Sequence, residues 1–494
     1  MGRAGRGEGV YNVVVIGGGT AGLVTAAGTA ALGGRVALVE RHLMGGDCLN
    51  YGCVPSKALI ASARLATRMR RAGRQALDPV DVAVDYGRVI RRLKTLRATI
   101  APIDSAERFE GLGVDVFFGA AALESRHAVA VGGNVLRTRH IVLATGGRAA
   151  IPDVPGLQEA GFLTNETVFE REEPPGRLLV MGGGPIGCEL AQAMARLGGR
   201  VTLVDRGRQL LHREDPDVAA LIQAGMEEDG VRVLLRARVI SVAPGRGGPH
   251  RVHVSQDDGS GAATAREVEA DTILVAAGRR PNIEGLGLEK AGVGVSPHGV
   301  TVNACLQTTR SNIYAAGDLC GPYQFTHFAE YQARLIVRNI LLSPLGGLAR
   351  GKADYRVVPW TTFTDPEAAR VGMNETEAAG AGVPFDVHRF PWSRLDRAVL
   401  ESDEVGFAKV IATKGRDTIL GATVVGSGAG EMIHELALAM RERIGLSRLS
   451  SMMHVYPSWS QAVQRSADAF MRTRLTPGAR ALFSRLYAWQ RRST

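Results

Sequence analysis

Two segments of this chain repeat one pattern at a constant offset of 165 residues, and this duplication constrains the fold more than any other feature. Residues 13–22 read VVVIGGGTAG and residues 178–187 read LLVMGGGPIG. Each segment continues through an Ala-rich stretch and a Gly-Gly-Arg-Val step to an acidic residue, which is Glu40 in the first copy and Asp205 in the second. The pattern predicts a strand, a glycine-rich turn, a helix and a second strand in each copy. We therefore expect an α/β protein built on two similar units.

The glycines in each copy have the G-x-G-x-x-G spacing of a dinucleotide-binding turn. In the first copy, Gly17 permits the tight turn, Gly19 lets the backbone approach a pyrophosphate, and Gly22 lets the helix pack closely on the strand. The pyrophosphate then faces the unpaired N–H groups at the helix N-terminus, and Glu40 can accept hydrogen bonds from ribose hydroxyls. The second copy places Gly182, Gly184, Gly187 and Asp205 at the same positions. Tight turns without a ligand are the alternative, but repetition of the full pattern favours two dinucleotide sites.

The composition excludes several other classes of protein. The 494 residues are 45% hydrophobic and 22% charged, which fits a folded chain of several domains. No stretch reaches the roughly 18 uninterrupted apolar residues of a membrane-spanning helix, and the first ten residues lack a secretory signal pattern. The net charge of +10 comes mostly from arginines spread along the chain, without the basic, aromatic-interleaved module of a nucleic-acid-binding protein. We expect a cytoplasmic protein that does not bind nucleic acid.

The cysteines indicate redox chemistry rather than a structural framework. Five cysteines are too few for a disulfide scaffold in a chain of this length. Cys48 and Cys53 lie five residues apart in GGDCLNYGCVPSK, residues 45–57, a spacing that is wrong for a zinc half-site, so we predict no metal site. The apolar run after Ser56 predicts a helix with Cys53 at its N-terminal end, where the amide dipoles lower the pKa of a thiol. A disulfide in this position accepts electrons from an adjacent reduced cofactor and passes them on.

With these motifs, residues 11–470 resemble the FAD-dependent pyridine nucleotide–disulfide oxidoreductases, which include dihydrolipoamide dehydrogenase, glutathione reductase and mercuric reductase. The most specific mark is the cysteine pair followed by Val-Pro-Ser-Lys. The resemblance implies that Cys48 and Cys53 form a redox-active disulfide, with Cys48 exchanging with the substrate and Cys53 contacting the flavin as a charge-transfer thiolate. It also implies that Lys57 pairs with Glu189 near the flavin. The implied fold has two Rossmann-like dinucleotide-binding domains, one for FAD and one for NAD(P), and an α+β C-terminal dimerisation domain.

The same resemblance assigns the cofactor-binding residues. The FAD site would include Gly17, Gly19, Gly22, Glu40, Gly46, Thr145, Gly146 and Asp318, the last in IYAAGD at residues 313–318. The nicotinamide site would include Gly182, Gly184, Gly187, Asp205, Arg206, Gly278 and Arg279. Asp205 and Gly187 suit NADH, whereas Arg206 could bind the 2′-phosphate of NADPH. We expect a slight preference for NADH.

The C-terminal segment departs from the family's disulfide reductases, in which a His-Pro-Thr segment and a following Glu act across the dimer. Here Tyr456 stands in the place of the proton-shuttling histidine, and Gln461 in the place of its Glu. Tyrosine ionises near pH 10, so it is a poor proton shuttle at neutral pH. His454 could replace it only with a shifted backbone. A tyrosine here resembles mercuric reductase, but no cysteine follows Cys320 to deliver a metal ion.

We predict five segments along the chain. They are the first part of the FAD-binding domain with the redox disulfide (1–153), the NAD(P)-binding domain (154–281), the second part of the FAD-binding domain (282–352), the dimerisation domain (353–470) and a basic amphipathic tail (471–494). The tail alternates arginines with apolar residues and predicts a helix. Two interpretations stay open for it: contact with the partner subunit of a homodimer, which we favour, and weak contact with an anionic membrane.

The main functional hypothesis is an FAD-dependent NAD(P)H oxidoreductase in which the Cys48–Cys53 pair passes electrons to an electrophilic small-molecule or metal-ion acceptor. A soft metal such as Hg(II), a quinone and a small disulfide are the candidate acceptors, in a mercuric reductase-like enzyme. Dihydrolipoyl dehydrogenase is the alternative enzyme. A slow-turnover flavoprotein that acts as a redox sensor or scaffold is the alternative from another class. The residues alone do not choose among acceptors, because acceptor choice depends on pocket shape.

Overall fold

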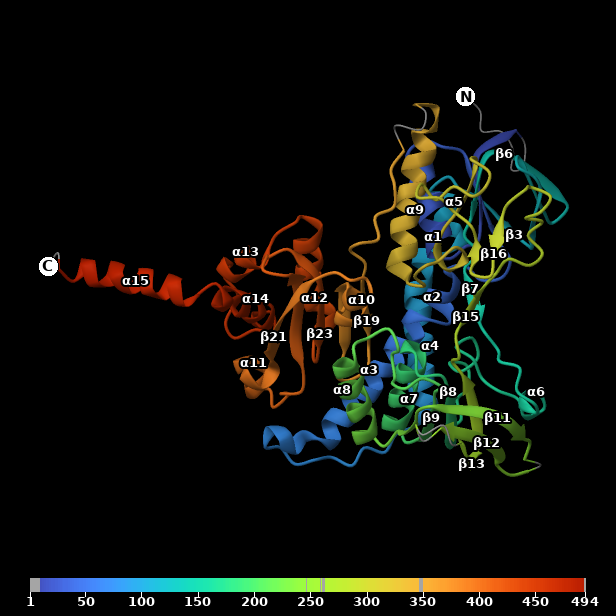
Figure 1. The fold of residues 1–494 in the computed structure, drawn as a ribbon. Coiled ribbons are helices and arrows are strands. Elements are labelled where there is room, and N and C mark those ends of the chain that lie inside the picture. Colours follow the sequence, from blue (N-terminus) through green and yellow to red (C-terminus); the bar gives the residue numbers. More distant parts are fainter. Residues whose placement is uncertain (1–8, 246, 258, 260–262, 346–349, 493–494) are drawn as a thin grey trace.

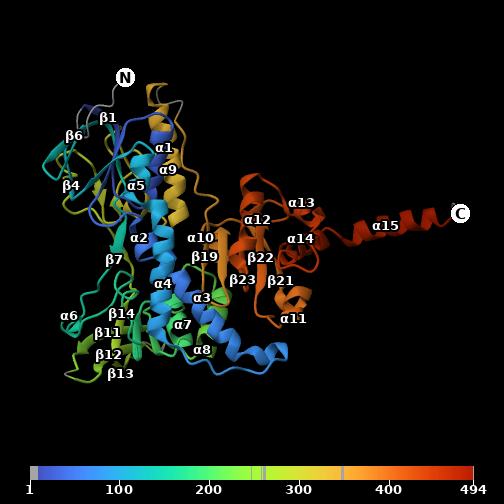
Figure 2. The ribbon, with the colours of Figure 1, turned by 180° about the vertical axis from the view of Figure 1, so that it is seen from behind.

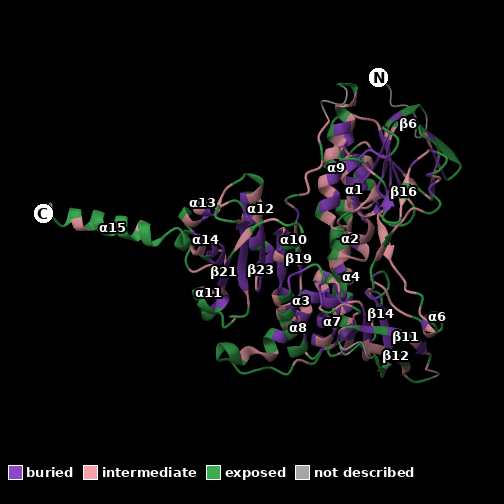
Figure 3. Cartoon of the chain, in the orientation of Figure 1, coloured by how far each residue is buried: buried purple, intermediate pink, exposed green. Residues whose placement is uncertain are grey.

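The chain folds as a mixed α/β structure with three main sheets, as the sequence predicts. The computed structural model describes residues 9–245, 247–257, 259, 263–345 and 350–492. Figure 1 shows two sheet-containing units along one side of the molecule and the third, with the C-terminal helices, beside them. The same arrangement is visible from behind in Figure 2. Buried residues fill the interior of each of these units (Figure 3).

The first glycine turn belongs to a seven-stranded sheet with the order β3-β2-β1-β6-β5-β4, to which β18 adds by pairing with β6. The strands are β1 (Val10–Ile16), β2 (Val36–Glu40), β3 (Asp115–Phe118), β4 (Ala121–Ser125), β5 (Ala128–Val131), β6 (Asn134–Leu143) and β18 (Ile313–Ala315). β1, β2, β3, β6 and β18 are parallel, whereas β4, β5 and β6 form an antiparallel meander. α1 (Thr20–Ala31) and α9 (Thr326–Leu341) pack together beside this sheet. Because the carboxyl ends of parallel strands meet at one edge, residues after β18 return to the turn that follows β1.

The second glycine turn belongs to a four-stranded parallel sheet with the order β10-β9-β8-β14. Its strands are β8 (Arg177–Met181), β9 (Arg200–Val204), β10 (Arg232–Leu234) and β14 (Thr272–Val275), and its helices are α7 (Pro185–Arg196) and α8 (Pro216–Glu228). A three-stranded antiparallel sheet of β11 (Ala237–Ala243), β12 (His250–Asp257) and β13 (Ala263–Ala270) packs its apolar face against this unit. Both helices begin with proline, whose fixed φ suits the first helical turn.

The third unit is a five-stranded antiparallel sheet with the order β19-β20-β23-β22-β21. Its elements are β19 (Pro359–Thr362), β20 (Ala368–Gly372), α10 (Glu375–Gly380), β21 (Phe385–Pro391), α11 (Asp396–Leu400), β22 (Phe407–Thr413), β23 (Ile419–Val425), α12 (Ala429–Arg441), α13 (Leu446–Ser451) and α14 (Gln461–Thr473). Buried Lys409 ties this sheet to the second unit, because its Nζ lies 3.0 Å from Asp215, 3.0 Å from Asp217 and 2.7 Å from Glu375. The remaining described elements are α2 (Gly46–Asn50), α3 (Cys53–Arg70), η1 (Ala72–Gln75), α4 (Tyr86–Ile100), η2 (Ala101–Asp104), α5 (Ala106–Gly111), β7 (Gly147–Ala149), α6 (Leu157–Ala160), β15 (Arg279–Pro281), β16 (Val295–Ser296), β17 (Gly299–Val300), η3 (Gly317–Leu319), η4 (Ser343–Leu345) and η6 (Trp392–Arg394), and the C-terminal helix is described below.

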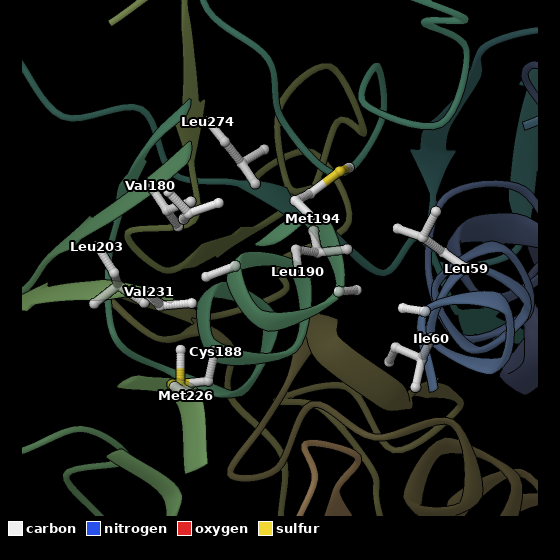
Figure 4. Close-up of a cluster of buried hydrophobic side chains, with 14 of the residues drawn as sticks. Leu59, Ile60, Val180, Cys188, Leu190, Met194, Leu203, Met226, Val231 and Leu274 are labelled. Atoms are coloured by element: carbon white, nitrogen blue, oxygen red, sulfur yellow. The ribbon is translucent and has the colours of Figure 1, made fainter. Parts of the chain in front are cut away.

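A hydrophobic cluster between α3 and α7 fixes two of the site-bearing helices to each other. Leu59 and Ile60 of α3 belong to the same buried cluster as Leu190 and Met194 of α7 (Figure 4). Cys188 lies in this cluster as well, and burial raises the pKa of its thiol far above the ordinary value. Because α3 begins at Cys53 and α7 carries Glu189, this packing sets the distance between the sulfur-bearing and carboxylate-bearing parts of the site.

The C-terminal tail is helical over a shorter range than the sequence suggests. Residues 471–473 complete α14, and a separate helix, α15, spans Pro477–Gln490. The Thr476 side chain accepts a hydrogen bond from the Ala479 N–H at 3.2 Å, and Pro477 follows as the first helical residue, so the chain stops one helix and starts another. Residues 493–494 lie outside the described part. Among the described helices, none is long and apolar enough to cross a bilayer.

Candidate active site

One large cavity collects most of the residues that the sequence singles out. It has a volume of about 2180 Å³ and runs between the two glycine turns. The predicted site residues that line it are Gly17, Gly19, Glu40, Gly46, Cys48, Cys53, Lys57, Thr145, Gly146, Gly182, Gly184, Glu189, Asp205, Arg206, Gly278, Arg279 and Asp318. Gly22 and Gly187 are packed against the two turns. A Cβ at Gly22 would lie 1.8 Å from the Gly17 carbonyl oxygen, and a Cβ at Gly187 would lie 1.9 Å from the Gly182 carbonyl oxygen.

The turn after β1 has the shape of a phosphate cradle. Gly17 has a φ of +113°, and a Cβ there would lie 2.2 Å from the carbonyl oxygen of Ala144. α1 begins at Thr20 without a side-chain cap, so its first N–H groups are open to an anion. Glu40 ends β2, and its Oε2 accepts a hydrogen bond of 2.6 Å from the Gly18 N–H. The carboxylate is thereby held at the turn, where a ribose would follow the pyrophosphate.

The turn after β8 repeats this geometry. Gly182 has a φ of +114°, and a Cβ there would lie 2.4 Å from the carbonyl oxygen of Ala276. α7 also begins without a side-chain cap. Asp205 accepts hydrogen bonds of 2.7 Å from the Gly183 N–H and 2.6 Å from the Gly207 N–H. Arg206 is exposed beside it at the cavity wall. The backbone of both turns therefore fits the two dinucleotides that the repeated motif predicts.

A partly buried charge cluster lies between the two units. The Arg279 guanidinium is 3.1 Å from the Asp318 carboxylate and 3.3 Å from that of Asp47. Burial raises the pKa of Asp318, and the adjacent guanidinium opposes this shift. Arg279 therefore contacts the Asp318 side of the cavity, so its assignment to the nicotinamide site stays a prediction.

The two cysteines lie on consecutive helices, the short α2 and the long α3, and their sulfurs lie within hydrogen-bonding reach of each other. Cys48 is on α2 and Cys53 is the first residue of α3, as the sequence predicts. Both are free thiols in this structure. A hydrogen bond from Cys48 is the main cause that lowers the pKa of Cys53 to about 6, and Thr326 and Lys57 add to it against the effect of burial. The same bond, with burial, raises the pKa of Cys48 far above its ordinary value. The opposite directions of the two shifts favour the thiolate of the reduced pair at Cys53 and the thiol at Cys48.

Lys57 and Glu189 form an ion pair beside the sulfurs. The Lys57 Nζ lies 2.7 Å from Glu189 Oε2, one helical turn along α3 from Cys53. The second oxygen, Oε1, accepts a hydrogen bond of 2.9 Å from the Phe363 N–H, and the Lys57 Nζ lies 4.6 Å from the centre of the Phe363 ring. Because Glu189 is held from two sides, it fixes the ammonium group near the Cys53 thiolate.

Replacing Lys57 with methionine is expected to raise the pKa of Cys53 by about one pH unit, because the ammonium group stabilises the thiolate. The rate of alkylation by iodoacetamide, measured against pH on the reduced protein, reports this pKa directly. Lys57→Arg keeps the charge and is the matched control. If the methionine and arginine variants titrate alike, Lys57 has no electrostatic role at the sulfur.

Tyr456 and His454 are not part of this cavity in the single chain. The Tyr456 hydroxyl donates a hydrogen bond of 2.8 Å to Asp396. This bond raises the pKa of the tyrosine, whose side chain is 65% exposed. His454 is turned inward, and its Nε2 lies 2.9 Å from Glu435 Oε1. His454 is thus engaged within its own unit, whereas Tyr456 is open to a partner.

The structure adds residues that the sequence does not single out. Thr326 Oγ1 lies 3.4 Å from Cys53 Sγ, although the two residues are 273 positions apart. Next to it, the Phe325 ring stacks on His327 at 5.4 Å and on Trp360 at 5.9 Å between ring centres, and all three line the cavity. The sequence indicates a role for Thr326 only through its position, because Thr326 begins the helix that follows the Gly317–Asp318 motif.

Comparisons with known proteins agree with this geometry. Residues 11–333 match the pyridine nucleotide–disulphide oxidoreductase family, and residues 358–467 match the dimerisation domain of that family. A dihydrolipoyl dehydrogenase of Chlamydia muridarum is 33% identical over 92% of this chain and 96% of its own. A mercuric reductase of Staphylococcus aureus is 30% identical over 94% of this chain and 83% of its own. The Cu(II) complex of the HOCl-induced flavoprotein disulfide reductase RclA from Escherichia coli superimposes with a TM-score of 0.80 at 28% identity, covering 93% of this chain and 99% of that one.

These matches span both nucleotide-binding units and the third sheet, and they include the two enzyme types that the motifs resemble. The protein is therefore an oxidoreductase of the FAD- and NAD(P)H-dependent class I pyridine nucleotide–disulfide oxidoreductase family.

Proposed function

We propose that this protein uses NADH and FAD to keep the Cys48–Cys53 pair reduced, and that the pair reduces a soft electrophilic acceptor, such as a thiophilic metal ion or a quinone. The observation that carries the proposal is the position of Cys53, which begins α3 with Thr326 Oγ1 3.4 Å from its sulfur and Lys57 one helical turn away, a setting that lowers the pKa of its thiol. Thiolates are the ligands that soft metal ions prefer. Oxidation of the dithiol to the disulfide releases two electrons, which matches a two-electron acceptor.

The residues of the cavity fit both cofactors. We assign Gly17, Gly19, Glu40, Thr145, Gly146 and Asp318 to FAD, held by residues 1–153 and 282–352, and Gly182, Gly184 and Asp205 to the nicotinamide nucleotide, held by residues 154–281. When bound, the cofactors supply hydride transfer from the nicotinamide through the flavin to the sulfurs. The protein orients the pair: Thr326 and Lys57 hold the Cys53 thiolate, and the Cys48 thiol donates to it until an acceptor arrives.

The C-terminal segment favours an acceptor that needs no strong proton donor. Reduction of a disulfide releases a thiolate that a nearby acid must protonate. Tyr456 serves this purpose poorly, because the hydrogen bond to Asp396 raises a pKa that is already high. Reduction of a soft metal ion needs no such proton donor: when Cys48 and Cys53 form the disulfide, the Cys48 proton is released and the two electrons pass to one Hg(II) ion or to two Cu(II) ions. The relatives named mercuric reductase and the Cu(II) complex of RclA support this choice.

Dihydrolipoyl dehydrogenase is the second candidate, because relatives with that name match the chain as closely as the mercuric reductases do. Tyr456 and Gln461 count against it, since they replace the family's proton shuttle. A slow redox sensor or scaffold is the third candidate, and the complete nucleotide motifs count against it.

The matched dimerisation domain supports a homodimer, in which we expect Tyr456 of one subunit to face Cys48 of the other. A cytoplasmic location is proposed because five cysteines in 494 residues do not make the disulfide framework that is typical of secreted proteins.

One acceptor panel separates these candidates. The FAD-loaded enzyme is assayed with Hg(II), Cu(II), a naphthoquinone, lipoamide and glutathione disulfide at matched concentrations. We expect NADH oxidation with a metal ion or the quinone to exceed that with either disulfide by at least about tenfold. Fast NADH formation from dihydrolipoamide would identify the second candidate instead. Rates at background with every acceptor would support the sensor.

NADH is expected to be the better nucleotide. The Asp205 carboxylate is held by two backbone N–H groups at the ribose position, where it repels a 2′-phosphate. Replacing Asp205 with serine should shift the ratio of kcat/KM for NADH to that for NADPH toward NADPH by roughly tenfold, which corresponds to the loss of about 1.4 kcal/mol of charge repulsion. Arg206→Gln is the comparison variant, because it tests whether the neighbouring cation attracts the phosphate. A wild-type enzyme that prefers NADPH tenfold would contradict the assignment.

A further inference from the structure

Every described residue of the helix α15 is exposed or half-buried. The helix follows the Thr476–Pro477 break and projects away from the third sheet (Figure 1), and no residue from Pro477 to Gln490 is buried. In Figure 3 the helix is mostly green, with pink where residues are half-buried. The exposed apolar side chains are Leu482 (56%), Phe483 (46%), Leu486 (49%), Tyr487 (64%) and Trp489 (67%). Burial within this chain therefore does not explain why five large apolar residues occur in one short helix.

These side chains share one face. At about 100° per residue, they fall within an arc of about 160° centred near Leu486. Arg480 borders the arc on the side of Tyr487 and Arg485 borders it on the side of Trp489, and Arg491 and Arg492 follow directly after the last helical residue. The opposite face carries Pro477, Ala481, Ser484 and Ala488, and one polar residue, Gln490, falls inside the apolar arc at the C-terminal end of the helix. The helix thus carries an apolar strip with one arginine on each side, an aromatic residue next to each of these sides, and two further arginines directly after its C-terminal end.

The charge of this segment is entirely positive. No acidic residue follows Asp468, whereas the segment carries Arg472, Arg474, Arg480, Arg485, Arg491 and Arg492. A protein groove that received the apolar strip would need carboxylates along both of its rims. A flat anionic bilayer needs no such match, because the strip enters the acyl boundary while the arginine stems extend back to the phosphate level on either side. Aromatic rings at the edges suit the same interface.

We propose that α15 is an interfacial membrane anchor that binds anionic lipid. The helix lies in the plane of the membrane with Leu482 and Leu486 inserted and the flanking arginines on lipid phosphates. A homodimer carries two such helices, so binding of the second is favoured by its high local concentration once the first is bound. This surface is separate from the cavity and does not depend on the identity of the acceptor.

Flotation of the FAD-loaded, full-length protein with vesicles tests the proposal. With phosphatidylcholine vesicles containing 30% phosphatidylglycerol, we expect binding at low salt that falls at least tenfold in 0.5 M salt and at least tenfold on pure phosphatidylcholine. Leu486→Gln should weaken binding about tenfold, since it removes the centre of the apolar strip. Ala488→Gln adds the same group to the opposite face and should bind like wild type. Both variants should keep the wild-type NADH oxidation rate.

Three results would overturn the proposal. The first is no flotation with anionic vesicles at low salt. The second is flotation that Leu486→Gln and Ala488→Gln weaken equally, because the contact would then be a general charge effect and not the apolar face. The third is a pair of findings: the wild type does not bind vesicles, and light scattering shows that the Leu486→Gln variant no longer forms a dimer. That combination would place α15 on the partner subunit.

Discussion

Replacing Cys53 with serine is expected to lower acceptor reduction by about a thousandfold or more, the scale of losing a group that takes part directly in the chemistry. Cys53 is the sulfur that Cys48, Thr326 and Lys57 hold as a thiolate, and serine at that position stays protonated at neutral pH. The remaining Cys48 thiol loses its partner and cannot form the disulfide. Steady-state NADH oxidation with the best acceptor of the panel measures the loss.

Cys48→Ser separates the roles of the two sulfurs. It should abolish acceptor reduction to a similar extent, yet it should leave an alkylatable thiolate at Cys53, because Thr326 and Lys57 remain. The pKa of that thiolate should rise above about 6, since the hydrogen bond from Cys48 is the main cause of the lowering. Cys305→Ser, outside the cavity, is the control and should change neither quantity. Substantial acceptor turnover in either active-site variant would show that the pair is not on the electron path.

Replacing the first glycine of each glycine-rich turn with alanine is expected to show which turn binds which nucleotide. Gly17→Ala forces a Cβ to within 2.2 Å of the Ala144 carbonyl oxygen at a positive φ, and Gly182→Ala does the same at 2.4 Å from that of Ala276. Such backbone strain and steric overlap destabilise the native conformation of each turn by about 3 kcal/mol. We therefore expect each altered turn to lose the shape that binds its nucleotide. Gly17→Ala should purify with little flavin, whereas Gly182→Ala should retain flavin and lose at least about a hundredfold in kcat/KM for NADH.

Flavin absorbance per subunit and NADH kinetics provide the measurements. Gly111→Ala is the matched control, because a Cβ there meets nothing within 4 Å and the backbone is not strained. Full flavin content in Gly17→Ala, or loss of flavin in Gly182→Ala with normal NADH kinetics, would reverse the assignment of the two sites.

The local motifs predict the nucleotide turns well because all their parts lie within about thirty residues of one another. Glu40 and Asp205 were expected at the ends of second strands, and each accepts a hydrogen bond from the middle glycine of its own turn. The position of Cys53 at a helix N-terminus follows from the same kind of local pattern.

Contacts between distant segments are the part that the sequence does not reveal. Thr326 reaches Cys53 only because β18 returns to the first sheet and directs α9 toward the cysteines. The hydrogen bond from Tyr456 to Asp396 likewise depends on how α11 packs in the third sheet. The tail was expected as one helix, but the Thr476–Pro477 pair divides it, a local signal that the alternation of arginine and apolar residues concealed.

The most direct test of the electron path is to count thiols during reduction. The oxidised, FAD-loaded protein is titrated with NADH in the absence of oxygen, and free thiols are then alkylated with iodoacetamide. The mass of the peptide that contains residues 45–57 is measured by mass spectrometry. One NADH per subunit should convert this peptide from a disulfide form to one alkylated at both Cys48 and Cys53. NADH consumption that leaves the peptide unalkylated would contradict the account, because electrons would then reach the acceptor without passing through the sulfurs.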